Sequence, residues 1–251
     1  MHTSKSLTLA IAALTCSLQA SAIELNEQLS LTITPAVFSD YRSSGISQTL
    51  GDPAAQLDIM LSHASGLYAG VWTSNVEYGY DWESDDDYGT RQEIDYYAGY
   101  YWQITDAISL DGYYNKYTYP GESQFNGADL YLTLDAYGFF IGGKHSFDTE
   151  ESYFNTYIGY RTLLPLEIGL ELRYENVDYK DDVFFNADYS KAEQDYNNWE
   201  IKLSRDLFGA TVSKAKFALP EQGVWVCFID LPNSQIELIE PYGDASPVWS
   251  F

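Results

Sequence analysis

The chain lacks the residues that would mark it as a disulfide-stapled module or a helical membrane protein. Only two cysteines, Cys16 and Cys227, occur among its 251 residues. Because the expected signal peptide contains Cys16, the mature chain keeps a single thiol and no intramolecular disulfide can form. After residue 22, no run reaches the ~18 consecutive apolar residues that a helical span needs. Any membrane insertion must therefore use strands.

Basic residues are also scarce. The chain has 13 Lys and Arg against 37 Asp and Glu, which gives a net charge of -24. Phosphate backbones are bound by clustered Lys and Arg, so nucleic acid is excluded as a partner. The simplest interpretation of so much acid is a solvated, repulsive surface.

The first 22 residues have the pattern of a secretory signal peptide. Met1 to Lys5 is a short positive segment, Ser6 to Leu18 is apolar, and Ala20-Ser21-Ala22 is a small-x-small cleavage site. The apolar segment is too short to span a membrane as a helix. We therefore expect export and removal of residues 1–22.

Beyond that segment, apolar and polar residues alternate from residue 25 to about residue 217. In one stretch Leu130, Leu132 and Leu134 alternate with polar residues, and from residue 166 to 173 an aliphatic face alternates with a face that carries three charges. Alternation at period two is typical of strands that have one apolar and one polar face. The pattern predicts twelve strands, near residues 25–37, 54–62, 67–76, 92–104, 107–118, 128–136, 139–146, 152–162, 166–177, 195–205, 208–217 and 223–230.

The connections between these strands decide between a soluble sandwich and a membrane barrel. Tight joints at residues 63–66, 105–106, 137–138 and 163–165 alternate with longer polar connections, many of them acidic. Short turns at one end and long loops at the other are typical of outer-membrane barrels. We therefore predict an all-β, antiparallel up-and-down transmembrane β-barrel of about twelve strands over residues 23–230, followed by a tail at 231–251.

One stretch of the sequence also resembles a known family. The segments Ser39-Asp40-Tyr41-Arg42, Gly45-Ile46-Ser47-Gln48-Thr49, Gly51-Asp52-Pro53-Ala54 and residues 65–76 are similar to a proteobacterial family of exported proteins. That family carries a porin label and is named after the trimethylamine N-oxide respiration cluster. The resemblance is strong over residues 37–76 and looser to about residue 217. It implies an uncharacterised outer-membrane barrel of a Gram-negative bacterium.

The polar face supplies the residues expected to line a pore. They are Asp58, Asp95, Asp111, Asp135, Arg161, Glu167, Glu171, Arg173, Glu200 and Lys202. Since acidic groups dominate, a pore should disfavour anions and pass cations, neutral or zwitterionic solutes. The leading hypothesis is a passive porin for small solutes, with outer-membrane lipid and lipopolysaccharide as its surroundings. The alternative is a closed structural or adhesive barrel that acts through its acidic external loops.

No catalytic or metal-binding pattern stands out, and we expect neither an enzyme nor a cofactor. His63 and His145 have no Ser or Cys partner at an interpretable spacing, although an outer-membrane hydrolase remains a third hypothesis. The acidic loop Asp81 to Asp87 does not match an EF-hand, because Asp86 stands where the loop glycine should be. Three interpretations of this loop stay open: a solvated loop, a calcium site, and a loop that binds lipopolysaccharide phosphates through divalent cations.

Overall fold

The computed structural model describes residues 21–78, 80–81, 86–87, 89–149, 152–182, 184–185, 192–207, 210–219 and 224–230. The expected signal peptide, apart from residues 21–22, lies outside the described residues, and so does the expected tail at 231–251. The cleavage point after Ala22 falls inside the first strand, Ser21–Glu24.

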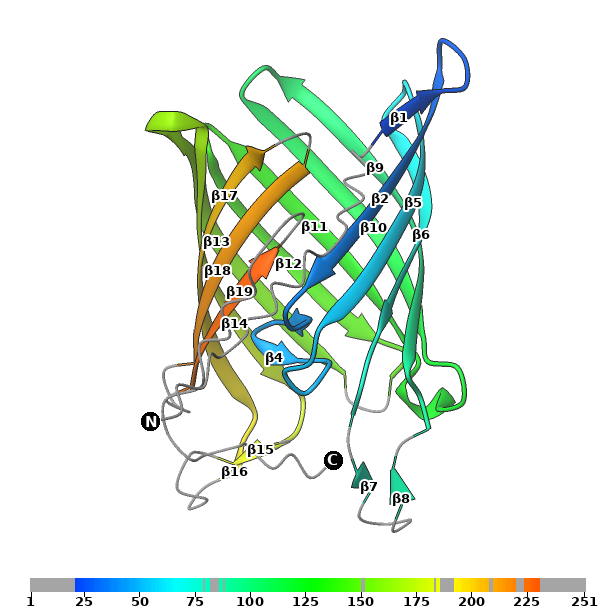
Figure 1. The fold of residues 1–251 in the computed structure, drawn as a ribbon, viewed down its shortest axis with the longest axis vertical. Helices are drawn as coiled ribbons and strands as arrows, with labels where there is room; N and C mark the ends of the chain where they lie inside the picture. Colours follow the sequence, from blue (N-terminus) through cyan, green and yellow to red (C-terminus); the bar gives the residue numbers. More distant parts are fainter. Residues whose placement is uncertain are drawn as a thin grey trace, which may run out of the picture.

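The described residues form an all-β structure dominated by one antiparallel sheet of thirteen strands (Figure 1). Each long strand pairs with the long strands before and after it along the chain. The strands of this sheet are β1 (Ser21–Glu24), β2 (Leu29–Phe38), β5 (Ala54–His63), β6 (Leu67–Asn75), β9 (Gln92–Thr105), β10 (Ile108–Thr118), β11 (Gly127–Ala136), β12 (Phe139–Phe147), β13 (Tyr153–Leu164), β14 (Ile168–Tyr179), β17 (Asp195–Leu207), β18 (Ala210–Leu219) and β19 (Val224–Asp230).

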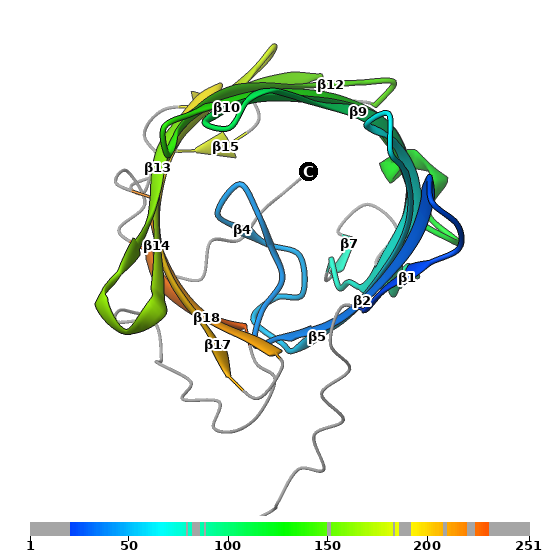
Figure 2. The same ribbon diagram turned by 90° about the horizontal axis from the view of Figure 1, so that it is seen from above.

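The sheet curves strongly, and in the view from above its strands surround a central space (Figure 2). Strand β2 pairs along its whole length with β5, from Leu29↔His63 to Phe38↔Ala54. On its other side the residue pair Phe38↔Asp230 joins β2 to β19. Within the described part of the chain, no helix is long and apolar enough to span a membrane.

The sequence pattern predicted these strands closely. Each of the twelve expected strands is present, most with bounds within two residues of the prediction. The first begins at Leu29 rather than at residue 25, because a turn at Asn26 to Gln28 separates it from the unexpected strand β1. The ninth begins at Ile168, since Leu166 and Glu167 adopt positive φ in a short 3-10 turn, η2 (Pro165–Glu167).

The two ends of the sheet differ as the sequence predicted. Tight turns join β5 to β6, β9 to β10, β11 to β12 and β13 to β14 at one end. At the other end the connections are longer, and three of them contain small hairpins (Figure 1). These hairpins pair β3 (Arg42–Ser43) with β4 (Ile46–Ser47), β7 (Tyr80–Asp81) with β8 (Asp86–Asp87), and β15 (Phe184–Phe185) with β16 (Ala192–Glu193).

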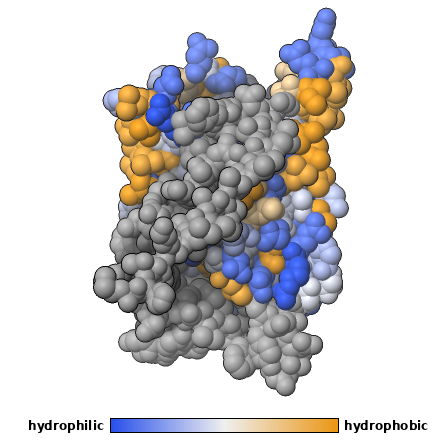
Figure 3. Space-filling model, in the orientation of Figure 1, coloured by the Kyte–Doolittle hydropathy of each residue, from blue (hydrophilic) through white to orange (hydrophobic). Residues whose placement is uncertain are grey.

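The buried side chains are mostly polar, whereas those of a soluble protein are mostly apolar. Among the described residues, fifteen polar or charged side chains are buried against eight hydrophobic ones. In β11, Asp129 is 4% exposed while its neighbours Leu130 and Leu132 are 53% and 56% exposed. We call the face that carries Asp129, and that looks onto the central space, the inner face, and the opposite one the outer face. Hydrophobic residues gather over the upper part of the visible outer surface (Figure 3).

Glycines let aromatic side chains lie flat on the inner face. A Cβ at Gly70 would meet the Tyr97 ring, and one at Gly99 would meet the Tyr68 ring. The two pairs lie side by side, because Gly70 is opposite Tyr97 and Tyr68 is opposite Gly99 in the β6–β9 register. The phenols then donate to carboxylates further along the wall.

Candidate functional site

The connection between β2 and β5, residues 39–53, folds toward the central space instead of extending away from it. Figure 2 shows its hairpin, β3 and β4, inside the space that the curved sheet surrounds. These residues also carry part of the family resemblance. We call this segment the inward loop.

Asp40 organises the inward loop. Its carboxylate is buried, with the residue 5% exposed, and it accepts hydrogen bonds from Arg42 Nε at 2.8 Å, Ser47 Oγ at 2.5 Å and Thr49 Oγ1 at 3.1 Å. Arg42 also donates from Nη1 to the carbonyl of Gly45 at 2.7 Å. Because one charged group holds donors from both arms of the hairpin, the loop keeps a defined shape.

The tip of the inward loop docks onto the sheet. Ser44 has φ of 49°, a left-handed conformation, which turns its side chain and carbonyl toward the wall. Its Oγ donates to Glu175 Oε1 at 3.1 Å and accepts from Asn155 Nδ2 at 2.8 Å. The phenol of Tyr196 donates to the Ser44 carbonyl at 3.1 Å. The tip is thus anchored to β13, β14 and β17.

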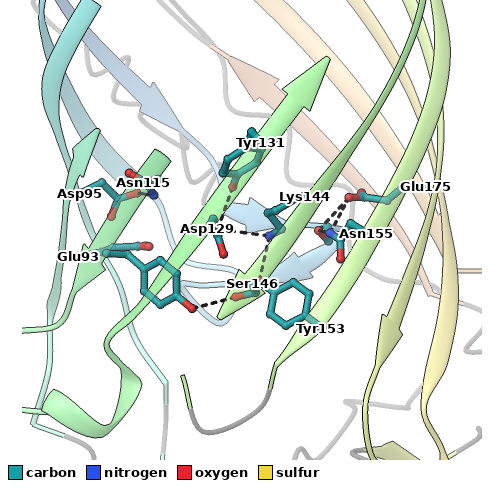
Figure 4. A network of polar contacts seen from close by, with 12 residues as sticks. Glu93, Asp95, Asn115, Asp129, Tyr131, Lys144, Ser146, Tyr153, Asn155 and Glu175 are labelled. Atoms are coloured by element: carbon teal, nitrogen blue, oxygen red, sulfur yellow. Dashed lines mark hydrogen bonds and ion pairs between the residues drawn. The ribbon is translucent and has the colours of Figure 1, made fainter. Parts of the chain in front are cut away.

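A cavity of about 240 Å³ lies between the inward loop and the inner face of the sheet. Its polar wall comes from β9, β10, β11 and β12, and Figure 4 shows these side chains gathered on neighbouring strands. Its other surfaces are largely tyrosine. The charged and amide residues that line it are Gln48, Glu93, Asp95, Asn115, Asp129 and Lys144.

Lys144 is the one cation among the described residues that line this cavity. It is 5% exposed, donates to the Tyr153 phenol at 2.9 Å and lies 3.8 Å from Asp129 Oδ2. Asp129 Oδ2 also accepts from the Tyr131 phenol at 3.0 Å. The lysine charge is therefore compensated within the wall, and its attraction for an anion in the cavity is reduced.

The three carboxylates are only partly satisfied. Glu93 accepts from the Tyr119 phenol at 2.9 Å, and Asp95 accepts from Asn115 Nδ2 at 2.7 Å. Each of Glu93, Asp95 and Asp129 has a second oxygen that is buried without a hydrogen-bond partner: Oε2, Oδ1 and Oδ1, respectively. Buried acceptors are normally paired, so three residues that line the cavity each carry an acceptor that the protein leaves unsatisfied.

Two tyrosines of the long connections, Tyr78 and Tyr119, close the cavity from the loop side. Their rings pack edge to face at 5.4 Å. Burial, followed by the charge of Glu93, raises the pKa of both phenols above the ordinary value. Both therefore stay neutral, and Tyr119 keeps the proton that it donates to Glu93.

Comparison with known proteins places the chain in one family. A family model described as "Bacterial protein of unknown function (Gcw_chp)" matches residues 24–218. The chain belongs to this Gcw_chp family. The match covers the inward loop and every strand that lines the cavity.

Two curated proteins share short segments with this Gcw_chp chain. Mitochondrial methylmalonyl-CoA epimerase of Mus musculus is 47% identical over 47 residues, which is 19% of this chain and 26% of the mouse protein. The enzyme of the same name from Dictyostelium discoideum is 41% identical over 51 residues, 20% of this chain and 30% of its own length. The chain thus spans less than a third of these relatives. No solved structure matches.

Most residues predicted to line a pore lie on the inner face of the Gcw_chp sheet. Asp58 accepts from the Tyr97 phenol at 2.6 Å, and Asp111 accepts from the Tyr68 phenol at 2.7 Å. Asp95 lies in the cavity wall. These carboxylates thus accept hydrogen bonds from side chains of neighbouring or nearby strands.

The remaining predicted residues form a charge ladder along the wall. Arg161 lies 3.3 Å from Asp135 and 3.6 Å from Glu171. Further along, Arg173 lies 3.3 Å from Glu175. Glu200 is opposite Arg173 and Lys202 is opposite Glu171 in the β14–β17 register. These ion pairs run along the wall, and the inward loop occupies the central space.

Three sequence predictions need separate mention. Glu167, expected on a strand, lies exposed in turn η2 and therefore not on the inner wall of β14. His63 contacts Ser65 Oγ at 2.9 Å within its turn, and His145 lies on the outer face near Phe147. Residues 82–85 of the acidic loop lie outside the described residues. Among the residues that the structure describes, no three His, Cys, Asp or Glu side chains gather closely enough to hold a metal ion.

Sequence reasoning missed the centre of the site. Glu93, Asp129, Lys144 and Glu175 were not among the predicted pore residues, although each shares strand parity with inner-face neighbours. Strict use of the two-residue period would have found them. With these four and without Glu167, the set comprises nine carboxylates and four cations, so acidic groups still outnumber basic ones in it.

Proposed function

We propose that this protein is a transmembrane β-barrel of the outer membrane of a Gram-negative bacterium, and that it passes small solutes passively without catalysing a reaction. The pairing of β2 with β5, together with the contact of β2 with β19, supports closure of the sheet. Closure removes the unpaired edges that hydrocarbon does not tolerate.

The outer face supports membrane insertion. Leu130, Leu132 and Leu134 stand 53%, 56% and 39% exposed in the middle of β11, where a soluble protein would bury them. Aromatic residues flank this aliphatic zone two strands away on either side, with Trp102 of β9 toward the turn end and Phe154 of β13 toward the loop end, both about half exposed. An apolar band between aromatic girdles is the pattern of a barrel in lipid.

The inward loop is the observation that carries the pore hypothesis. It crosses a central space walled by polar side chains, and the cavity left beside it is about 240 Å³. A passage that ran beside the loop would be narrow and would admit only small solutes. Because carboxylates outnumber cations nine to four among the inner-face residues named above, the passage would favour cations, neutral and zwitterionic solutes over anions.

The same loop favours one alternative, a closed structural barrel. Its tip makes three hydrogen bonds to the wall through Ser44, which would hold it in place as a plug. In that case the external acidic loops would be the working part of the molecule.

Single-channel recording of the refolded protein in planar bilayers separates these two functions. The matched variant replaces residues 42–47 with two glycines, which removes the hairpin tip and keeps Asp40 and Thr49. A passive porin gives discrete steps in the wild type and larger steps in the variant. A silent wild type with a conducting variant would support the closed barrel. If both fold, as judged by circular dichroism, and both are silent, the protein is not a pore.

A further inference from the structure

The cavity beside the inward loop has the features of a binding site. Glu93 and Asp129 are 6% and 4% exposed, and both line the cavity with one oxygen lacking a partner. Asp95 presents a third such oxygen from the same strand as Glu93. An unpaired buried acceptor raises the free energy of the empty site, and a donor brought by a guest lowers it.

The unpaired atoms specify what the guest must carry. All three are carboxylate oxygens, which accept hydrogen bonds and donate none when ionised. Lys144, the cation of the described wall, has its ammonium group directed to Tyr153 and Asp129. With three carboxylates and one lysine the lining is acidic, so a guest with positive charge and N–H donors fits best.

The tyrosines add a second selective surface. Tyr41, Tyr78, Tyr117 and Tyr131 are among the rings that line the cavity. Aromatic faces attract organic cations and pack against their methylene groups. A short alkyl chain between two ammonium groups would match both the rings and the separated carboxylates.

We propose that the cavity binds a small organic cation that carries N–H donors, with a primary diamine as the simplest example. The proposal deepens the proposed function, because it names the solute class that the pore would select. The site itself does not require an open path, since binding can be measured without conduction.

The test is calorimetric titration of the folded, detergent-solubilised full-length protein with 1,4-diaminobutane at low ionic strength. Three further probes isolate the chemistry. The diol 1,4-butanediol has donors but no charge, tetramethylammonium has charge but no N–H donor, and calcium chloride tests for a metal ion. Saturable binding of the diamine, at least about tenfold tighter than that of each comparator, is expected because charge-assisted hydrogen bonds contribute strongly.

Two isosteric variants locate the site. Asp95→Asn removes one cavity carboxylate, and Asp111→Asn removes an inner-face carboxylate outside the cavity lining. The two are matched, because each aspartate accepts one hydrogen bond of 2.7 Å from an inner-face side chain. We expect Asp95→Asn to weaken diamine binding about tenfold and Asp111→Asn to change it less than about twofold.

Several results would overturn the proposal. They are absence of saturable diamine binding to the folded protein, equal binding of the diol or of tetramethylammonium, tighter binding of calcium, or equal effects of the two variants. Diamine binding by a barrel that conducts no current would uphold the site and refute the pore. Conduction without diamine binding would support the pore and refute the binding site.

Discussion

An arginine in the middle of the outer face should destabilise the protein strongly in lipid and hardly at all in water. Leu132 is the sixth of ten residues in β11 and is 56% exposed, so it should lie near the membrane midplane. Leu67 is the first residue of β6, at the turn end, and is 57% exposed. The two leucines are thus equally exposed on the outer face and differ in depth.

For Leu132→Arg we expect a loss of about 2 to 4 kcal/mol in unfolding free energy, the cost of arginine at the midplane of a barrel. For Leu67→Arg the loss should be about 0 to 1 kcal/mol, because arginine at the interface keeps its charge in water. Urea unfolding in phospholipid vesicles, followed by tryptophan fluorescence, measures both. If the variants lose equal stability in vesicles, or if the wild type folds without lipid or detergent, the outer face does not contact hydrocarbon.

Three further predictions concern the inner face. Lys144→Met should lower the unfolding free energy by about 3 to 5 kcal/mol in a urea titration, because it leaves Asp129 buried without its cation. Ser44→Ala should speed proteolysis of the inward loop about tenfold, since the tip loses both hydrogen bonds of its hydroxyl. In an open pore, the double variant Glu171→Gln and Glu200→Gln should shift the reversal potential measured in a salt gradient toward the value for anions. The shift should be larger at low ionic strength, where charges are less screened.

Each of these predictions has its own contrary result. Unchanged urea midpoints in Lys144→Met would mean that the Asp129 charge is compensated elsewhere. Ser43→Ala is the control for the loop, because its hydroxyl makes no hydrogen bond to the residues that the structure describes. Cleavage of Ser43→Ala as fast as that of Ser44→Ala would refute the docking argument. An unchanged reversal potential would place Glu171 and Glu200 outside the ion path.

The sequence by itself determined the strands and their faces. Alternation is a local property, because successive side chains of a strand point to opposite faces whatever the rest of the chain does. Leu130, Leu132 and Leu134 were therefore assigned together to one face, and their exposure confirms it. Glu167 was misplaced for an equally local reason. The apolar–polar alternation of the sequence includes residues 166 and 167, but both have positive φ and belong to the turn before β14.

Only the tertiary structure decided where the inward loop goes and what it encloses. Ser44 meets Asn155, Glu175 and Tyr196, which are 111, 131 and 152 residues away, respectively. No period or spacing in the sequence encodes such contacts. They depend on how many strands the sheet places between β2, where the loop begins, and β13, β14 and β17, which the loop contacts. The cavity and its unpaired carboxylate oxygens exist because curvature of the sheet brings β9 to β12 opposite that loop.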